Sequence, residues 1–275
     1  MNRYSWLRDI KAVLLDVDGV LYRGTSIIPD AHAFLEFLAS HHIRFLYVTN
    51  NSTMDAAGYA ERLRRRGFPA TAEHVIGSAE TTAHLLARKY PHRPPVLVIG
   101  EEGLHQALKK QHFPITDVAD RAEIVVSGMD RSLTYDRLAE ATYALRRGAA
   151  FYATNPDRTY PTERGLAPGA GAIIAALEAA SDRTATVVGK PEPPIFQLAL
   201  ERARVAPANA LMIGDRLETD ILGGKRVGMH TALVLTGVTQ EPPPPGPNMP
   251  DIVVQNLTEL QRWWEAALTA VENEQ

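Results

Sequence analysis

Short apolar runs alternate with longer amphipathic segments along the whole chain. The runs are rich in β-branched residues and contain few polar positions, which predicts strands of a parallel sheet that is buried on both faces. The longer segments place apolar residues three or four positions apart, which predicts helices. Strand and helix alternate throughout, so we predict an α/β protein with mainly parallel sheets.

The same pattern gives the expected positions of the elements. The expected strands are residues 12–17, 44–50, 75–78, 96–100, 123–128, 149–155, 184–189, 210–215, 231–237 and 251–254. The expected helices are residues 29–42, 54–66, 103–111, 135–148, 171–181, 194–205, 217–228 and 257–271.

Polar residues gather where several of these strands end. In open α/β sheets, functional groups collect outside the carboxyl ends of the strands. Here these ends supply carboxylate oxygens for a hard cation, donors for an anion and one positive charge. They carry Asp16-Val17-Asp18-Gly19, Thr49-Asn50-Asn51-Ser52, Lys190-Pro191, and Asp215 with Asp220 five residues further on.

The acidic residues suit two separate chemical roles. Mg²⁺ takes oxygen ligands, and Asp16 and Asp215 can each give one. Asp16 and Asp18 are two positions apart, so in a strand their side chains point the same way. A metal-bound carboxylate accepts a proton poorly, so one acid can be the nucleophile and the other the general acid and base. Each motif alone also suits a turn or a helix cap, and the inference rests on their joint occurrence.

Composition excludes several function classes. The chain has 275 residues and a formal net charge of −3, which gives no electrostatic case for binding nucleic acid or an anionic membrane. It has 0 cysteines, so thiolate catalysis and cysteine-ligated metal sites are excluded. No apolar run approaches the roughly 20 residues of a membrane span. We expect a cytoplasmic protein.

Four segments resemble the four motifs of the haloacid dehalogenase superfamily: DVDGVLYRG, VTNNS, VGKPEP and IGDRLETDI. Their longer forms, together with NPD at residues 155–157, resemble the branch that carries a large α/β cap between the second and third motifs. That branch includes para-nitrophenyl phosphatase-like enzymes, phosphoglycolate phosphatases, pyridoxal phosphatases and the N-acetylglucosamine-operon phosphatase. The resemblance implies a Rossmann-like, doubly wound parallel sheet core with an inserted α/β cap domain.

The resemblance also implies a role for each matched residue in phosphoryl transfer. Asp16 would be the nucleophile that forms an aspartyl-phosphate, and Asp18 would protonate the leaving group and then activate water. Thr49 and the amide of Asn50 would hold the phosphoryl group, and Lys190 would neutralise its charge.

The remaining matched residues lie around the phosphate and the metal. Backbone amides near Gly19 can donate to the phosphoryl group, and Asn51 would lie close by. Mg²⁺ would be held by Asp16, the backbone carbonyl of Asp18 and Asp215. Asp220 would be an acid outside these direct ligands.

These roles predict a Mg²⁺-dependent phosphomonoesterase that acts on a small phosphorylated metabolite. A departing halide needs no protonation, so Asp18 favours phosphate monoesters over haloacids. Two other interpretations stay open: a phosphomutase, and a non-catalytic protein of the same fold that binds a phosphorylated ligand. A dinucleotide-binding oxidoreductase is disfavoured because no strand leads into GxGxxG.

The long interval between Ser52 and Gly189 predicts a second domain, because it holds strands and helices of its own. We expect a discontinuous core domain of residues 1–79 and 184–275, and a cap of residues 80–183. Asn155 and Asp157 are the cap's candidate substrate-binding residues, and Met129 and Asp130 are weaker candidates. Relatives often pair through the cap, which implies a homodimer.

Overall fold

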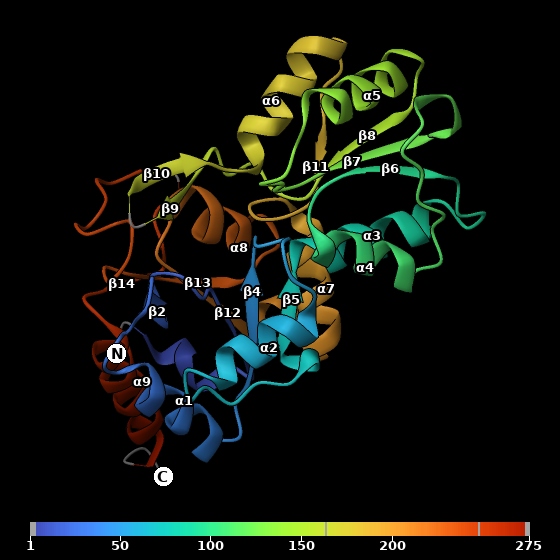
Figure 1. The fold of residues 1–275 in the computed structure, drawn as a ribbon. Coiled ribbons are helices and arrows are strands. Elements are labelled where there is room, and N and C mark those ends of the chain that lie inside the picture. Colours follow the sequence, from blue (N-terminus) through green and yellow to red (C-terminus); the bar gives the residue numbers. More distant parts are fainter. Residues whose placement is uncertain (1–3, 163, 247, 273–275) are drawn as a thin grey trace. The chain divides into compact units, whose positions relative to one another are not determined.

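The computed structural model describes residues 4–162, 164–246 and 248–272, and its chain divides into two compact units (Figure 1). The first unit comprises residues 1–48, 64–69 and 196–275, and the second comprises residues 49–63 and 70–195. None of the helices in the described part of the chain has the length and apolar content needed to span a bilayer.

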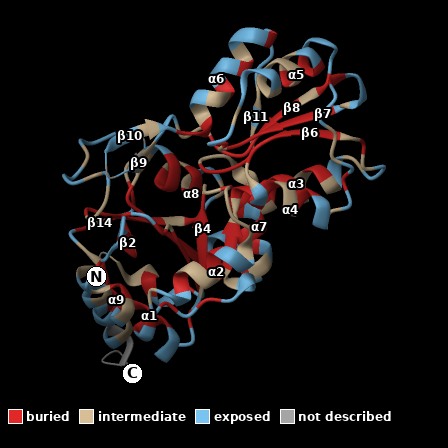
Figure 2. Ribbon diagram, in the orientation of Figure 1, coloured by how far each residue is buried: buried red, intermediate tan, exposed pale blue. Residues whose placement is uncertain are grey.

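The first unit contains a parallel sheet with the strand order β14-β13-β12-β1-β4. Its strands are β14 (Ile252–Val254), β13 (His230–Val234), β12 (Ala210–Gly214), β1 (Ala12–Leu15) and β4 (Arg44–Thr49). Every residue of β1 and β12 is buried, as Figure 2 shows for the middle of this sheet. The apolar runs without polar alternation therefore do form strands that are covered on both faces.

The chain winds outward from the middle of this sheet in two directions. From β1 it passes through α1 (Ala31–Ser40) to β4, and from β12 it passes through α8 (Leu222–Arg226) to β13 on the other side. Crossovers between parallel strands are right-handed, so the two directions place α1 and α8 on opposite faces of the sheet. The neighbouring strands β1 and β12 therefore flank the point at which the strand order reverses, where α/β sheets bind ligands.

Aromatic side chains join α1 to the last helix, α9 (Leu257–Glu272). The Trp264 ring lies 6.5 Å from the ring of Phe34 and 5.9 Å from that of Phe37. The Trp264 side chain is 0% exposed, whereas its neighbour Trp263 is 41% exposed. One turn of α9 thus presents one tryptophan to the core and the other outward.

The second unit contains its own parallel sheet, with the strand order β11-β8-β7-β6. Its strands are β11 (Thr186–Val187), β8 (Ala150–Ala153), β7 (Ile124–Ser127) and β6 (Val96–Ile99). Helices α3 (Ser78–Lys89) and α4 (Glu102–Lys110) pack on one face, and α5 (Tyr135–Arg146) and α6 (Ala170–Ser181) pack on the other.

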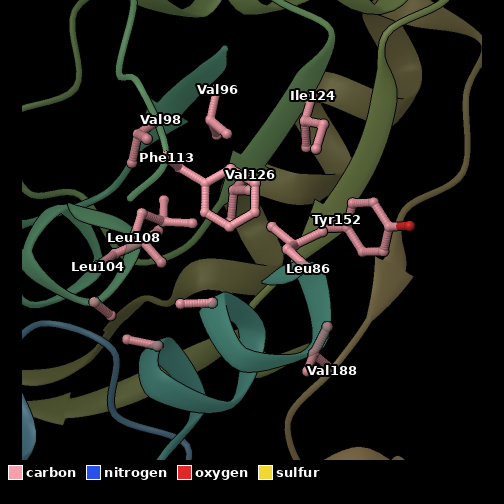
Figure 3. Close-up of a cluster of buried hydrophobic side chains, with 13 residues drawn as sticks. Leu86, Val96, Val98, Leu104, Leu108, Phe113, Ile124, Val126, Tyr152 and Val188 are labelled. Carbon is pink, nitrogen blue, oxygen red and sulfur yellow. The ribbon is translucent and has the colours of Figure 1, made fainter. Parts of the chain in front are cut away.

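Alternate residues of these strands supply the two faces. Figure 3 shows the cluster under α3 and α4, where Val96, Val98, Ile124, Val126 and Tyr152 meet Leu86, Leu104 and Leu108. The intervening residues Leu97, Ile99, Val125 and Phe151 pack on Leu145, Ile174 and Leu177. This period of two is the pattern of a strand buried on both sides.

Most of the expected elements form, and the α/β prediction is confirmed. The helix expected at 54–66 is α2 (Ala56–Arg64), α7 is Pro193–Ala203, and the expected third strand is β5 (Val75–Gly77). Two short hairpins were not expected: β2 (Tyr22–Arg23) with β3 (Ser26–Ile27), and β9 (Thr159–Thr162) with β10 (Gly165–Pro168). These strands lack the continuous apolar run that marks the sheet strands in the sequence.

Two helices differ from the pattern. Helix α3 was not expected because its first turns contain serine and threonine, which are weak helix formers. In the structure, the Thr81 and Thr82 hydroxyls are buried in the helix because each donates to the carbonyl four residues earlier, Gly77 and Ser78 respectively. The helix expected at 217–228 is a π-helical turn, Leu217–Ile221, followed by α8.

The two compact units do not divide the chain at residues 79 and 183. The second unit also takes in residues 49–63, 70–79 and 184–195. The segments that carry Thr49, Asn50 and Lys190 are therefore packed with the middle of the chain. The expected boundaries of the cap at 80 and 183 stay a prediction.

The two adjacent tryptophans provide a matched test of packing in the first unit. Trp264→Ala is expected to lower the free energy of unfolding by about 3–5 kcal/mol, because it empties a fully enclosed aromatic site. Trp263→Ala, which removes a half-exposed ring, is expected to cost about 1 kcal/mol or less. Urea unfolding followed by far-UV circular dichroism measures both. Equal losses in the two variants would contradict the described packing of α9.

Candidate active site

Three carboxylates converge at the carboxyl edge of the first unit's sheet. Asp16 follows β1, Asp215 follows β12, and Asp220 lies in the π-helical turn after β12. Each offers one oxygen, and these oxygens all lie within 4.8 Å of one another. Asp215 and Asp220 are 1% and 0% exposed. The Asp16 backbone N–H donates to the Ile213 carbonyl at 2.9 Å, which continues the β1–β12 pairing up to the acids.

The Asp215 carboxylate is held by the loop that follows β13. The Val238 N–H donates to Asp215 Oδ2 at 2.6 Å, and the Thr239 N–H donates to the Asp215 carbonyl at 3.1 Å. A Cβ at Gly19 or at Gly237 would overlap the Asp215 carboxylate, so both positions require glycine. These backbone groups fix one Asp215 oxygen and leave little room for another rotamer.

Asp220 is brought to the same place by the π-helical turn. Its Oδ2 accepts a hydrogen bond from the Arg216 N–H at 3.1 Å, and its side chain lies where a Cβ at Gly214 would stand. A regular helix from residue 217 would carry Asp220 to another angle, because a π-turn holds one more residue than an α-turn. The departure from the expected helix at 217–228 therefore positions an acid.

Asp18 lies outside this group of carboxylates. The chain turns after Val17, with the Leu21 N–H donating to the Val17 carbonyl and the Gly19 N–H donating to the Tyr22 carbonyl. Gly19 has a φ of +85°, which favours glycine in this turn. Asp18 is exposed, whereas Asp16 is partly covered. The two acids, although two residues apart, therefore have different surroundings.

The second unit positions a different set of predicted residues, beginning with Thr49. The buried Thr49 hydroxyl donates to the Tyr59 hydroxyl at 3.3 Å and accepts from the Asn51 N–H at 3.1 Å. Asn51 Oδ1 accepts from both the N–H and the hydroxyl of Thr53. The Asn51 side chain thus stabilises the local turn.

Asn50, Lys190 and the two predicted cap residues form one hydrogen-bonded group. Asn50 Oδ1 accepts from the Lys190 N–H at 2.8 Å, and Asn50 Nδ2 donates to the Lys190 carbonyl at 3.1 Å. Asp157 Oδ2 accepts from Asn50 Nδ2 at 3.2 Å and from Asn155 Nδ2 at 2.9 Å. Lys190 is 3% exposed. The structure therefore joins the second and third motifs to the Asn-Pro-Asp segment.

The segment after Asn51 is anchored on α4. The Gly103 N–H donates to the Thr53 carbonyl at 3.1 Å, and a Cβ at Gly103 would overlap the backbone of Met54. Lys110 Nζ lies 2.8 Å from Asp55 Oδ2, and this hydrogen bond lowers the pKa of the Asp55 carboxyl. A close backbone contact and an ion pair thus hold residues 53–55.

The weaker candidates, Met129 and Asp130, serve contacts within the second unit. The Met129 N–H donates to Ser52 Oγ at 3.4 Å. Asp130 Oδ2 pairs with Arg137 Nη1 at 2.7 Å, and Asp130 Oδ1 accepts from the N–H and the hydroxyl of Ser132. Asp130 is buried, so these contacts satisfy its charge.

The structure therefore brings the predicted residues together in two groups, one in each unit. Sequence reasoning missed the residues that support them: Gly237 and Val238 beside Asp215, Gly214 beside Asp220, and Gly103 beside Met54. Only Gly214 had a signal in the sequence, because it stands directly before Asp215 at a strand end. The others lie far in sequence from the residues that they support.

The acidic group of the first unit fits a hard divalent cation. All of its donors are carboxylate oxygens, which suit Mg²⁺ and Ca²⁺ better than softer metals. Buried carboxylates this close repel one another, and a bound cation relieves that repulsion. Asp16, Asp215 and Asp220 are the side chains that could hold it.

Comparison with known proteins agrees with this geometry. A family model described as haloacid dehalogenase-like hydrolase matches residues 13–114, and a second model of that kind matches residues 187–260. The acid sugar phosphatase of Staphylococcus aureus (strain USA300) is 40% identical over 233 residues, which cover 85% of this chain and 89% of that protein.

Solved structures show the same likeness over most of the chain. The 4-nitrophenylphosphatase of Thermotoga maritima is 34% identical with a TM-score of 0.85, covering 94% of this chain and 98% of that one. The glycerol phosphate phosphatase of Mycobacterium tuberculosis in complex with magnesium is 35% identical with a TM-score of 0.87, covering 93% and 78%. These matches confirm the expected core with an inserted α/β cap. The chain belongs to the haloacid dehalogenase-like hydrolases and is a phosphatase of that family.

Proposed function

We propose that this phosphatase is a Mg²⁺-dependent phosphomonoesterase that works through an aspartyl-phosphate on Asp16. The observation that carries the proposal is the convergence of the Asp16, Asp215 and Asp220 oxygens within 4.8 Å at the switch point of the sheet. A related glycerol phosphate phosphatase has been crystallised with magnesium and with calcium, which supports a hard divalent cation.

The two aspartates of the first motif divide the chemistry between them. A carboxylate oxygen of Asp16 attacks phosphorus while the bond between phosphorus and the leaving oxygen breaks, and Asp18 gives its proton to that oxygen. Asp18 then takes a proton from water as the water attacks the aspartyl-phosphate, which restores Asp16 and releases phosphate. The exposure of Asp18 supports this role, because a proton carrier must reach both the leaving group and water.

The remaining predicted residues bind the phosphoryl group. We assign the Asn50 N–H as a donor to its oxygens, together with the Thr49 hydroxyl once it turns from Tyr59, and we place Gly19 and Asn51 close to the phosphoryl group. Lys190 supplies a positive charge, and its burial supports this role because a buried ammonium interacts more strongly with an anion than an exposed one. Such fixed groups stabilise the charge of the transition state without reorganising.

The carboxylates of Asp16 and Asp215, with the Asp18 carbonyl, are proposed to hold Mg²⁺, and Asp220 supports them. When bound, this ion neutralises phosphate charge and orients the reacting oxygens.

The substrate class follows from the names of the relatives. We propose a small phosphorylated metabolite such as a sugar phosphate or a glycerol phosphate, because proteins named for these activities match most of this chain. The cap of residues 80–183 is proposed to influence which substrate is accepted. We also propose a homodimer formed through the cap, which light scattering at micromolar concentration would test.

Removal of the nucleophile or of the metal is expected to abolish turnover. Asp16→Asn is expected to lower kcat for p-nitrophenyl phosphate by at least about 10³-fold, since covalent catalysis is lost. Excess EDTA is expected to stop the wild-type enzyme, and added Mg²⁺ is expected to restore it. Asp9→Asn, at an exposed acid outside the site, is the control and is expected to keep full activity. Activity that survives in Asp16→Asn, or that ignores chelation, would overturn the proposed function.

A glycine next to Asp215 provides a test of the metal site that leaves every acid in place. Gly237→Ala puts a methyl group against the Asp215 carboxylate, so it is expected to raise the Mg²⁺ concentration for half-maximal activity by about tenfold or more. Gly246→Ala is the control, because its methyl group would meet its nearest neighbour, the Pro244 carbonyl oxygen, at 3.9 Å. Titration of activity with MgCl₂ measures both variants. An unchanged Mg²⁺ dependence in Gly237→Ala would contradict the role of Asp215.

A further inference from the structure

The Asn50 side chain is fully used by hydrogen bonds inside the second unit. A carboxamide has two N–H donors, and both are engaged: one by the Lys190 carbonyl and one by Asp157 Oδ2. Its oxygen accepts from the Lys190 N–H. The Asn50 side chain therefore hydrogen-bonds both backbone groups of Lys190, its N–H and its carbonyl.

Asp157 and the peptide groups of Lys190 together set the orientation of this amide. An ionised carboxylate only accepts hydrogen bonds, so Asp157 Oδ2 can face only the NH₂ end of Asn50. With the NH₂ end turned to Asp157, the oxygen end faces the Lys190 N–H. The reversed amide would set NH₂ against that N–H and its oxygen against two acceptors, so it would lose all three hydrogen bonds.

Asp157 is itself fixed by its neighbours in the loop after β8. Asn155 Nδ2 donates to the same Oδ2, and Asn155 Oδ1 accepts from the Thr154 hydroxyl at 2.8 Å. Thr154 and Asn155 are buried. The Gly171 N–H donates to the Asp157 carbonyl at 2.8 Å, so the backbone at Asp157 is held as well.

The chain that leads to Lys190 is supported from the same loop. The Val188 N–H donates to the Ala153 carbonyl at 3.0 Å, and the Gly189 N–H donates to the Thr154 carbonyl at 2.8 Å. Val188 is buried in the cluster drawn in Figure 3. Lys190 is thus fixed by backbone pairing on its N-terminal side and by Asn50 at its own peptide groups.

We propose that Asp157 and Asn155 are positioning residues that act on catalysis through Asn50 and Lys190. They orient the Asn50 amide, which sets the backbone of Lys190 and so the place at which its ammonium meets the phosphoryl group. This inference rests on the proposed function, and it gives both residues an indirect role in place of the direct contact with substrate that the sequence led us to expect. The carboxylate of Asp157 is required as a hydrogen-bond acceptor and not as a charge.

The two roles predict different dependence on the leaving group. The phosphoryl group is common to all phosphate monoesters, so a defect in Lys190 lowers kcat/KM by one factor for every substrate. A residue that contacts the leaving group would instead affect p-nitrophenyl phosphate and glycerol phosphate by different factors. Orthovanadate, which resembles the phosphoryl group and has no leaving group, gives an independent readout.

The experiment compares Asp157→Ala and Asp157→Asn with wild type. Asp157→Ala is expected to lower kcat/KM for both substrates by the same factor, about tenfold or more, and to weaken inhibition by orthovanadate. Asp157→Asn is expected to keep most of the activity, since an amide oxygen can accept from Asn50 and Asn155. Asp136→Ala, at an exposed acid in the first turn of α5, is the control.

A double-mutant cycle tests the connection to Asn50. In an Asn50→Ala background, Asp157→Ala is expected to cause no further loss, because its effect passes through the missing amide. Additive losses, a loss in Asp157→Asn equal to that in Asp157→Ala, or unequal factors for the two substrates would overturn the inference. It would also fall if Asp157→Ala, shown to be folded by its thermal melting curve, kept full activity.

These outcomes separate the inference from the proposed function. A wild-type protein that releases no phosphate would overturn the proposed function, and the inference would fall with it. An active wild type with an active Asp157→Ala variant would overturn the inference alone.

Discussion

Mutual repulsion among Asp16, Asp215 and Asp220 is the constraint on which the first unit is built. Bringing three carboxylate oxygens within 4.8 Å costs free energy unless positive charge or directed donors offset it. The backbone N–H groups of Val238 and Arg216 offset part of this repulsion by donating to the carboxylates. A bound divalent cation would offset the remainder. The glycines at 19, 214 and 237 are a second consequence, because the crowded carboxylates leave no space for side chains there.

Lys190 presents the opposite electrostatic problem. A lysine that is only 3% exposed must be held in place by the protein, since its long side chain would otherwise reach water. The structure fixes the backbone of this residue and not only its side chain. Asn50 provides the means, because a carboxamide can serve both peptide groups of one residue at once.

The fold was predictable because buried parallel strands have a plain sequence pattern. Short apolar runs such as 12–15 and 210–214, separated by helices, are typical of buried parallel strands. The hairpin formed by β9 and β10 could not be found, because its strands lack a continuous apolar run. Helix α3 could not be found, because threonines occupy part of its buried face. The acids after β1 and β12 were predictable from strand ends, since parallel strands deliver their carboxyl ends to one edge. The pairing of Asn50 with Asp157 was not, because residues 107 positions apart give no local signal.

The anchoring of residues 53–55 on α4 has a consequence for how such proteins can be recombined. Gly103 and Lys110 belong to the second unit's α4, yet they hold the turn that follows Thr49 and Asn50. An insertion with any residue other than glycine at the position of Gly103 would overlap the Met54 backbone, because only a hydrogen fits there. Exchange of the insertion therefore demands that residues 49–55 be exchanged with it. The unit that can be transferred between such proteins is the insertion together with residues 49–55.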